Sequence, residues 1–158
     1  MKAIAIILVG HSDWGKSKTL VALTGGCRNS EWWTLNDRCF CLRRKSNEDE
    51  PDPYWDFIQK LVPQETPCVL ATFCPNFEKH EMRTEQILDE LSKKYALFFF
   101  VLKHSWFSRA DYLKTISPEE IERLREYGET EVFDQQGADE FVRAAAFRKY
   151  IEATVERC

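Results

Sequence analysis

Eight residues near the start of the chain, GHSDWGKS at positions 10–17, have the types and spacing that can bind phosphate. They satisfy the pattern G-x-x-x-x-G-K-[ST] through Gly10, Gly15, Lys16 and Ser17. The two glycines allow a tight turn whose backbone N–H groups point at phosphate oxygens. Lys16 would place its ammonium on the outer phosphates, and Ser17 would offer its hydroxyl to Mg²⁺. The loop therefore predicts binding of a nucleoside triphosphate, ATP or GTP, together with Mg²⁺.

The predicted site comprises this loop and the residue that follows it. Lys16 and Ser17 are the candidates for a catalytic role, and Ser17 is the candidate metal ligand. Asp13 is expected to be a turn residue, because Asp tolerates left-handed backbone; a role near the metal is the less favoured alternative. Trp14 could shield the phosphates or pack on a neighbouring loop, and both interpretations stay open. The candidate nucleotide-binding residues are Gly10, His11, Ser12, Asp13, Trp14, Gly15, Lys16, Ser17 and Lys18.

The segments that flank the loop support this interpretation. Ala3–Val9 is an aliphatic run without alternation, which is typical of a central parallel strand buried on both faces. A helix is expected over residues 16–24 and is ended by Gly25 and Gly26. Ligands of open parallel sheets bind beyond the carboxyl ends of the strands, and the loop lies at such an end.

The rest of the chain alternates strands and helices, which predicts an α/β fold with a parallel sheet and helices on both faces, in three layers. Residues 1–158 are expected to form one domain. An acidic surface loop is expected over residues 46–53. The expected strands are Trp32–Leu35 and Arg38–Arg43 as a hairpin, then Cys68–Phe73, 96–102 and 131–133; the expected helices are 54–61, 84–95, 118–127 after the cap Ser117, and 138–156.

Composition bears on the partners and the location of the protein. The formal net charge is −4, whereas a protein that binds nucleic-acid backbones is usually basic, so we expect no nucleic-acid partner. No apolar run approaches the roughly 20 residues of a membrane span, so no membrane association is expected. Six cysteines occur without a C-x-x-C pair and are interpreted as reduced, which favours a cytoplasmic location. The tryptophans Trp32, Trp33 and Trp55 are expected to pack in the core.

Residues 4–26 resemble the start of the translation-factor class of GTPases. In that class the loop reads GHxDHGKT, followed by TL and a short helix. The residues that fit are Gly10, His11, Asp13, Gly15, Lys16, Ser17 and Leu20. The resemblance implies a P-loop NTPase fold, and it implies a guanine nucleotide if the later motifs of the class survive.

The later motifs are degenerate. The class carries DxPGH after a buried strand, but Phe73 stands at the place of the metal-supporting Asp and Phe77 at the place of the catalytic His. The base-reading motif NKxD is matched only by Lys103, and residues 134–136 match the SAK-like loop weakly. A carboxylate for the metal would have to come from elsewhere, with Asp37 and Glu31 as candidates.

Three functions remain open at this stage. The first is a GTPase-like protein with slow or absent hydrolysis that acts as a switch or assembly element, with a protein partner. The second is a small nucleotide or metabolite kinase, in which Arg109 of the stretch 103–114 could belong to a lid that contacts the transferred phosphoryl group. His104, at the end of a strand, could contact the ligand. The third is an adaptor that keeps the P-loop fold without catalysis.

Overall fold

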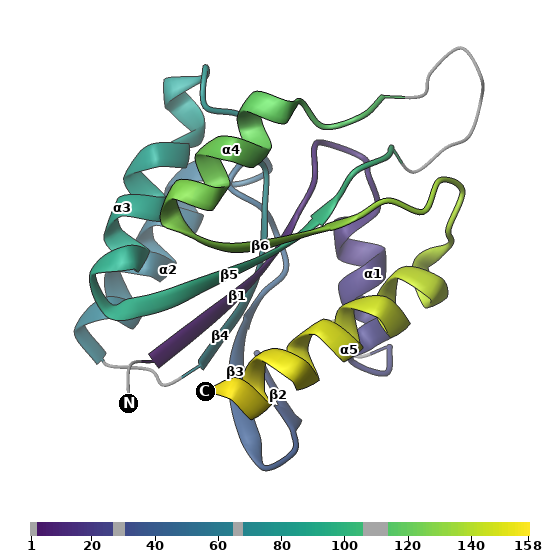
Figure 1. Ribbon diagram of the computed structural model, residues 1–158. Coiled ribbons are helices and arrows are strands. Elements are labelled where there is room, and N and C mark those ends of the chain that lie inside the picture. The colour runs from purple at the N-terminus through teal and green to yellow at the C-terminus, as the bar shows by residue number, and fades with distance from the viewer. Residues whose placement is uncertain (1–2, 27–30, 65–67, 106–113) are drawn as a thin grey trace.

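A computed structural model describes residues 3–26, 31–64, 68–105 and 114–158 (Figure 1). Its centre is a six-stranded sheet in the order β2-β3-β4-β1-β5-β6. All neighbouring pairs are parallel except β2 with β3, which form the predicted hairpin. The strands are β1 (Ala3–Val9), β2 (Trp32–Leu35), β3 (Arg38–Arg43), β4 (Cys68–Phe73), β5 (Tyr95–Leu102) and β6 (Gly128–Phe133).

Helices cover both faces of this sheet, which confirms the three-layer α/β/α prediction (Figure 1). One face carries α1 (Lys16–Leu23) and α5 (Glu140–Arg157). The other face carries the remaining helices. These are α2 (Pro51–Gln64), α3 (Thr84–Lys94), preceded by the short 3₁₀ helix η1 (His80–Met82), and α4 (Pro118–Tyr127).

The central strand β1 is buried on both sides, as its continuous apolar sequence predicts. Because successive side chains of a strand point to opposite faces, its residues divide between two cores. Ala5, Ile7 and Val9 pack with residues of α2, α3 and α4. The side chains at positions 4, 6 and 8 pack with residues of α1 and α5. The sheet is therefore held from both faces, and its carboxyl edge is a rigid base for the loop that follows β1.

Several segments differ from the sequence prediction; for example, β6 was expected over residues 131–133 but begins at Gly128. The helix expected over residues 54–61 begins at Pro51, because proline is compatible with a first helical turn. The loop expected to lie on the surface over residues 46–53 was predicted only in part: Asp49 is exposed, but Ser46 and Asn47 are almost fully buried. The partners of Asn47 lie on segments distant in sequence, so local polarity could not reveal its burial.

The cysteines, the lengths of the helices and the exposure of Trp32 bear on expectations drawn from composition. The cysteines described here carry free thiols, of which Cys41, Cys68 and Cys74 are buried. No helix among the described residues has the length and apolar character that a membrane span needs. Trp32 was expected in the core but is 52 % exposed, because it lies on the edge strand β2.

Candidate functional site

The phosphate-loop sequence forms a compact turn between β1 and α1. The Gly10 N–H donates to the Phe73 carbonyl at the end of β4, with an N···O distance of 3.1 Å. Asp13 and Gly15 have left-handed backbone, with φ of 61° and 82°. The Trp14 N–H donates back to the His11 carbonyl at 3.3 Å. Left-handed residues within such a turn direct neighbouring backbone N–H groups toward one concave side, which is the geometry that binds anions.

Lys16 is buried within this turn. Its ammonium donates to the carbonyls of Gly10 and His11, both at 2.7 Å. An ammonium has three N–H groups, so these bonds leave one donor for an incoming oxygen. Burial lowers the pKa of Lys16, and this effect is opposed chiefly by Cys74 and by the carboxylates of Glu48 and Asp49. The cation is thus fixed at the loop before any ligand arrives.

The other predicted residues divide into exposed and buried sets. Ser12, Asp13, Ser17 and Lys18 are exposed, and Asp13 is a turn residue as expected. Trp14 is 5 % exposed and belongs to the apolar core between the sheet and α2, α3 and α4. Of its two interpretations, the structure therefore favours packing.

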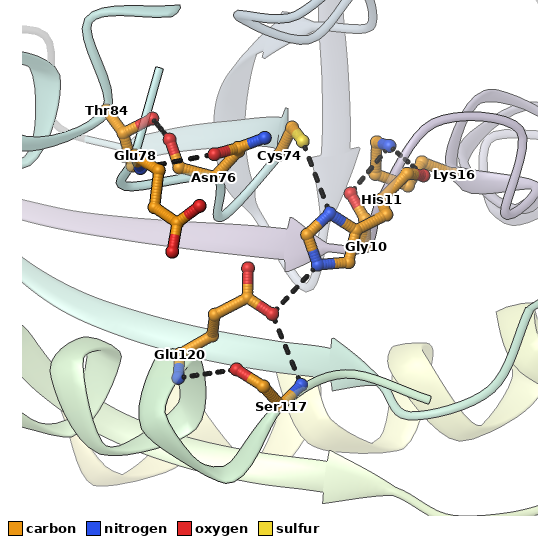
Figure 2. Close-up of polar contacts among 9 residues, drawn as sticks. All are labelled: Gly10, His11, Lys16, Cys74, Asn76, Glu78, Thr84, Ser117 and Glu120. Atoms are coloured by element: carbon orange, nitrogen blue, oxygen red, sulfur yellow. Dashed lines mark hydrogen bonds and ion pairs between the residues drawn. The ribbon is translucent and has the colours of Figure 1, made fainter. Parts of the chain in front are cut away.

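The His11 side chain lies between two distant segments, as Figure 2 shows. Its Nε2 is 2.9 Å from Oε1 of Glu120, and its Nδ1 is 3.8 Å from Sγ of Cys74. Its ring also meets the Trp14 ring edge-on, with 5.2 Å between centroids. Both imidazole nitrogens therefore face protein groups.

Glu120 reaches His11 from the first turn of α4. Ser117 caps this helix as predicted, and the two residues form a capping box: the Ser117 hydroxyl accepts from the Glu120 N–H, and the Ser117 N–H donates to Oε1 of Glu120 (Figure 2). Burial tends to raise the pKa of Glu120, but the hydrogen bonds from His11 and Ser117 outweigh it and hold the pKa below its usual value. Glu120 is then an anion that only accepts hydrogen bonds, so Nε2 of His11 carries the donated proton.

The segment after β4 holds no carboxylate. Phe73 is fully buried and its ring centroid lies 6.3 Å from that of Tyr54. Next to it, burial and a hydrogen bond to Glu48 raise the pKa of the Cys74 thiol to about 12. Cys74 is therefore a neutral thiol at physiological pH and not a nucleophile.

Asn47 fixes this segment to the acidic loop. Its Oδ1 accepts from the Cys74 N–H at 2.7 Å, and its amide nitrogen donates to the carbonyls of Cys74 and Met82 at 3.2 and 3.1 Å. A third contact joins the amide nitrogen to the Thr84 hydroxyl at 3.5 Å. Asn47 was not among the residues predicted from the sequence, because nothing in its local sequence indicates these partners.

The structure changes which carboxylates can serve a metal. Asp37 lies in the hairpin turn before β3, at the amino ends of the parallel strands. The phosphate loop lies at their carboxyl ends, so the prediction of Asp37 as a metal-supporting carboxylate was wrong. Glu31 lines the same cleft as Ser17. Glu48 and Asp49, which the sequence analysis did not consider, lie close enough to Lys16 to affect its pKa. The described residues contain no ready-made cluster of His, Cys, Asp and Glu for a metal ion.

Arg143 of α5, which was also not among the residues predicted from the sequence, binds the phosphate loop from the face of the sheet that carries α1 and α5. Its side chain is 1 % exposed and donates to the Trp14 carbonyl and, at 3.0 Å, to the His104 carbonyl. His104 and Lys103 both bind Asp134, at 2.6 and 2.9 Å. His104 is thus held by protein groups. Arg109, the other substrate candidate, lies outside the described residues.

Comparisons with known proteins identify the fold. No protein-family model matches the chain, and no curated protein does. Among solved structures, one described as "Structure and function of the FeoB G-domain from Methanococcus jannaschii" is similar, with a TM-score of 0.56 and 16% sequence identity. The alignment covers 99% of each chain. The chain therefore has the fold of a P-loop GTPase domain.

Proposed function

We propose that this chain binds a nucleoside triphosphate with Mg²⁺ at residues 10–17 and hydrolyses it slowly or not at all. The observation that carries the proposal is the buried Lys16 ammonium, held by the carbonyls of Gly10 and His11 in a left-handed turn at the carboxyl edge of the sheet. A buried cation with an unused donor suits an oxyanion ligand. The likeness to a G-domain favours GTP over ATP.

Each loop residue has a distinct task in this proposal. The backbone N–H groups around Gly15 bind phosphate oxygens, assisted by the first turn of α1. Lys16 neutralises the outer phosphates with its remaining N–H. Ser17 is exposed and would hold Mg²⁺ through its hydroxyl, with Glu48, Asp49 or Glu31 supporting the metal's water shell. Bound Mg²⁺ supplies charge neutralisation at the phosphates.

Slow hydrolysis follows from what the neighbouring residues cannot do. The imidazole of His11 faces Glu120 and Cys74, so it does not present a nitrogen to a water molecule. The Phe77 ring carries the Arg123 guanidinium 4.1 Å from its centroid and has no group that could orient water. Each missing positioning or electrostatic group commonly costs ~10²–10³ in rate. Turnover is therefore expected at or below the unassisted level of about 10⁻⁴ s⁻¹.

A chain that holds a nucleotide without rapid turnover fits a switch or assembly element that acts through a protein partner. The exposed side chains of Phe141 and Val142, at the start of α5, support such a partner. We further propose that the protein works in the cytoplasm, on the basis of its free thiols.

Phosphate release from GTP and ATP, measured with purified chain and Mg²⁺ at steady state, tests this proposal. We expect measurable binding and turnover at or below about 10⁻⁴ s⁻¹. Turnover above ~1 s⁻¹ that Lys16→Ala abolishes would contradict slow hydrolysis, because an efficient catalytic group would then be present. Failure of both nucleotides to bind would contradict the proposal as a whole.

A further inference from the structure

A cleft of about 1230 Å³ lies beside the phosphate loop, where β3 ends between α1 and α2. Ser17 and Glu31 line one part of it, and Arg44 and the aromatic side chain of Phe57 line another. Its volume is somewhat above that of a usual small-molecule pocket. The cleft is thus large enough for a ligand of its own.

Arg44, the first residue after β3, is the unusual member of this lining. All three nitrogens of its guanidinium are buried, and none has a hydrogen-bond partner. Its backbone is fixed, since its carbonyl accepts from the Thr72 hydroxyl at 2.6 Å. The neighbouring cations differ: Arg43 and Lys45 both bind Glu50, at 3.0 and 2.8 Å. The Glu50 carboxylate is therefore engaged by the two cations that flank Arg44 in sequence.

This arrangement is energetically unfavourable without a ligand. An arginine cannot lose its proton in a protein, so Arg44 stays charged. A buried charge without a partner is unfavourable, and an oxyanion that accepts two parallel hydrogen bonds from it removes that cost. Because water does not reach the nitrogens, the guanidinium must turn into the cleft to meet the anion. The hydrogen bonds that the Arg44 guanidinium would form with the anion favour that rotation.

We propose that Arg44 anchors a second anion-binding site in this cleft, distinct from the Lys16 ammonium although Ser17 of the phosphate loop also lines the cleft. The ligand is a small molecule with a carboxylate or phosphate group on an aromatic body. Further cations, Lys18 and Lys60, line the same cleft and favour an anion. Phe57 and the half-exposed Trp32 offer aromatic surface for the body of the ligand. The proposal does not depend on nucleotide binding.

Calorimetric titration of the full chain with phenyl phosphate, benzoate and uncharged benzamide tests the site. We expect at least one of the two anions to bind, benzamide not to bind, and the tighter anion to identify the group that is recognised. Arg44→Gln should weaken binding at least about tenfold, as expected for hydrogen bonds to a charged group. Lys60→Gln, which removes an exposed cation of the same cleft, should change affinity less than about threefold.

Lys16→Ala separates this site from the phosphate loop and should leave benzoate or phenyl phosphate binding intact. The proposal is overturned if neither anion binds, if benzamide binds equally, if Arg44→Gln has no effect, if Lys60→Gln weakens binding as much as Arg44→Gln, or if Lys16→Ala abolishes binding. The melting temperature of ligand-free Arg44→Gln gives a second readout. It should equal or exceed that of the parent, because an unpaired buried charge is removed. A clear decrease would show a structural partner for the guanidinium and would also overturn the proposal.

Discussion

Replacing Asn47 with alanine tests how the acidic loop is held beside the phosphate loop. Asn47 is fully buried, and its side chain joins this loop to the segment after β4 through the Cys74 N–H and carbonyl and the Met82 carbonyl. Alanine keeps none of these bonds. The Cys74 N–H would then be buried without an acceptor.

The expected loss in free energy of unfolding follows from how many buried groups lose a hydrogen-bond partner. Leaving a buried polar group unsatisfied costs roughly 1–3 kcal/mol, and one N–H and two carbonyls are affected here. These costs are not additive, because water can enter the space that the side chain leaves. We expect Asn47→Ala to lower the free energy of unfolding by about 3–4 kcal/mol. For a chain of this size this corresponds to a melting temperature lower by about 10 °C.

Urea denaturation followed by circular dichroism measures this change. The matched control is Gln135→Ala, which truncates an exposed amide in the loop after β6 and should change stability by less than about 0.5 kcal/mol. The reasoning is refuted if Asn47→Ala loses less than about 1 kcal/mol, or no more than the control does.

Two further predictions concern stability. Although burial opposes it, the bonds from His11 and Ser117 hold the pKa of Glu120 below its ordinary 4.5. Glu120 therefore stabilises the fold above that pH and loses this contribution as the pH falls through its folded pKa. The stability advantage of the parent over Glu120→Gln should thus shrink as the pH falls below about 4.5; an advantage independent of pH would contradict this. A Cβ at Gly128 would overlap the main-chain carbonyl of Leu97. Gly128→Ala should thus lower the free energy of unfolding, measured by urea denaturation, by about 1–3 kcal/mol, and an unchanged value would show that β6 can move away.

Local sequence patterns predicted most of the fold. Ala3–Val9 and Cys68–Phe73 are continuous apolar runs, and both are strands with the predicted bounds. Ser117 caps α4 as its Ser-Pro-Glu-Glu sequence predicts. In contrast, the strand expected over residues 131–133 already begins at Gly128, directly after α4. The extended backbone of Gly128 and its closeness to Leu97 depend on strand pairing, which a local pattern does not contain.

The site was predicted in part, for the same physical reason. The turn of residues 10–17 is encoded by consecutive residues, so the positions of Asp13, Gly15 and Lys16 follow from the motif. The groups around it come from far along the chain: Glu120 meets His11 across 109 residues, and Arg143 meets Trp14 across 129. No spacing rule predicts such contacts, because folding of the sheet brings them together.

The central claim is that residues 10–17 bind a nucleoside triphosphate through Lys16. Calorimetric titration of GTP, with ATP in parallel and Mg²⁺ present, tests it most directly on the parent, on Lys16→Ala and on Lys149→Ala, a control that removes an exposed lysine of α5. We predict that the parent and Lys149→Ala bind with equal affinity. Lys16→Ala should lose measurable binding while its melting temperature stays close to that of the parent, because burial already disfavours this charge. Unchanged affinity in a folded Lys16→Ala chain would contradict the account.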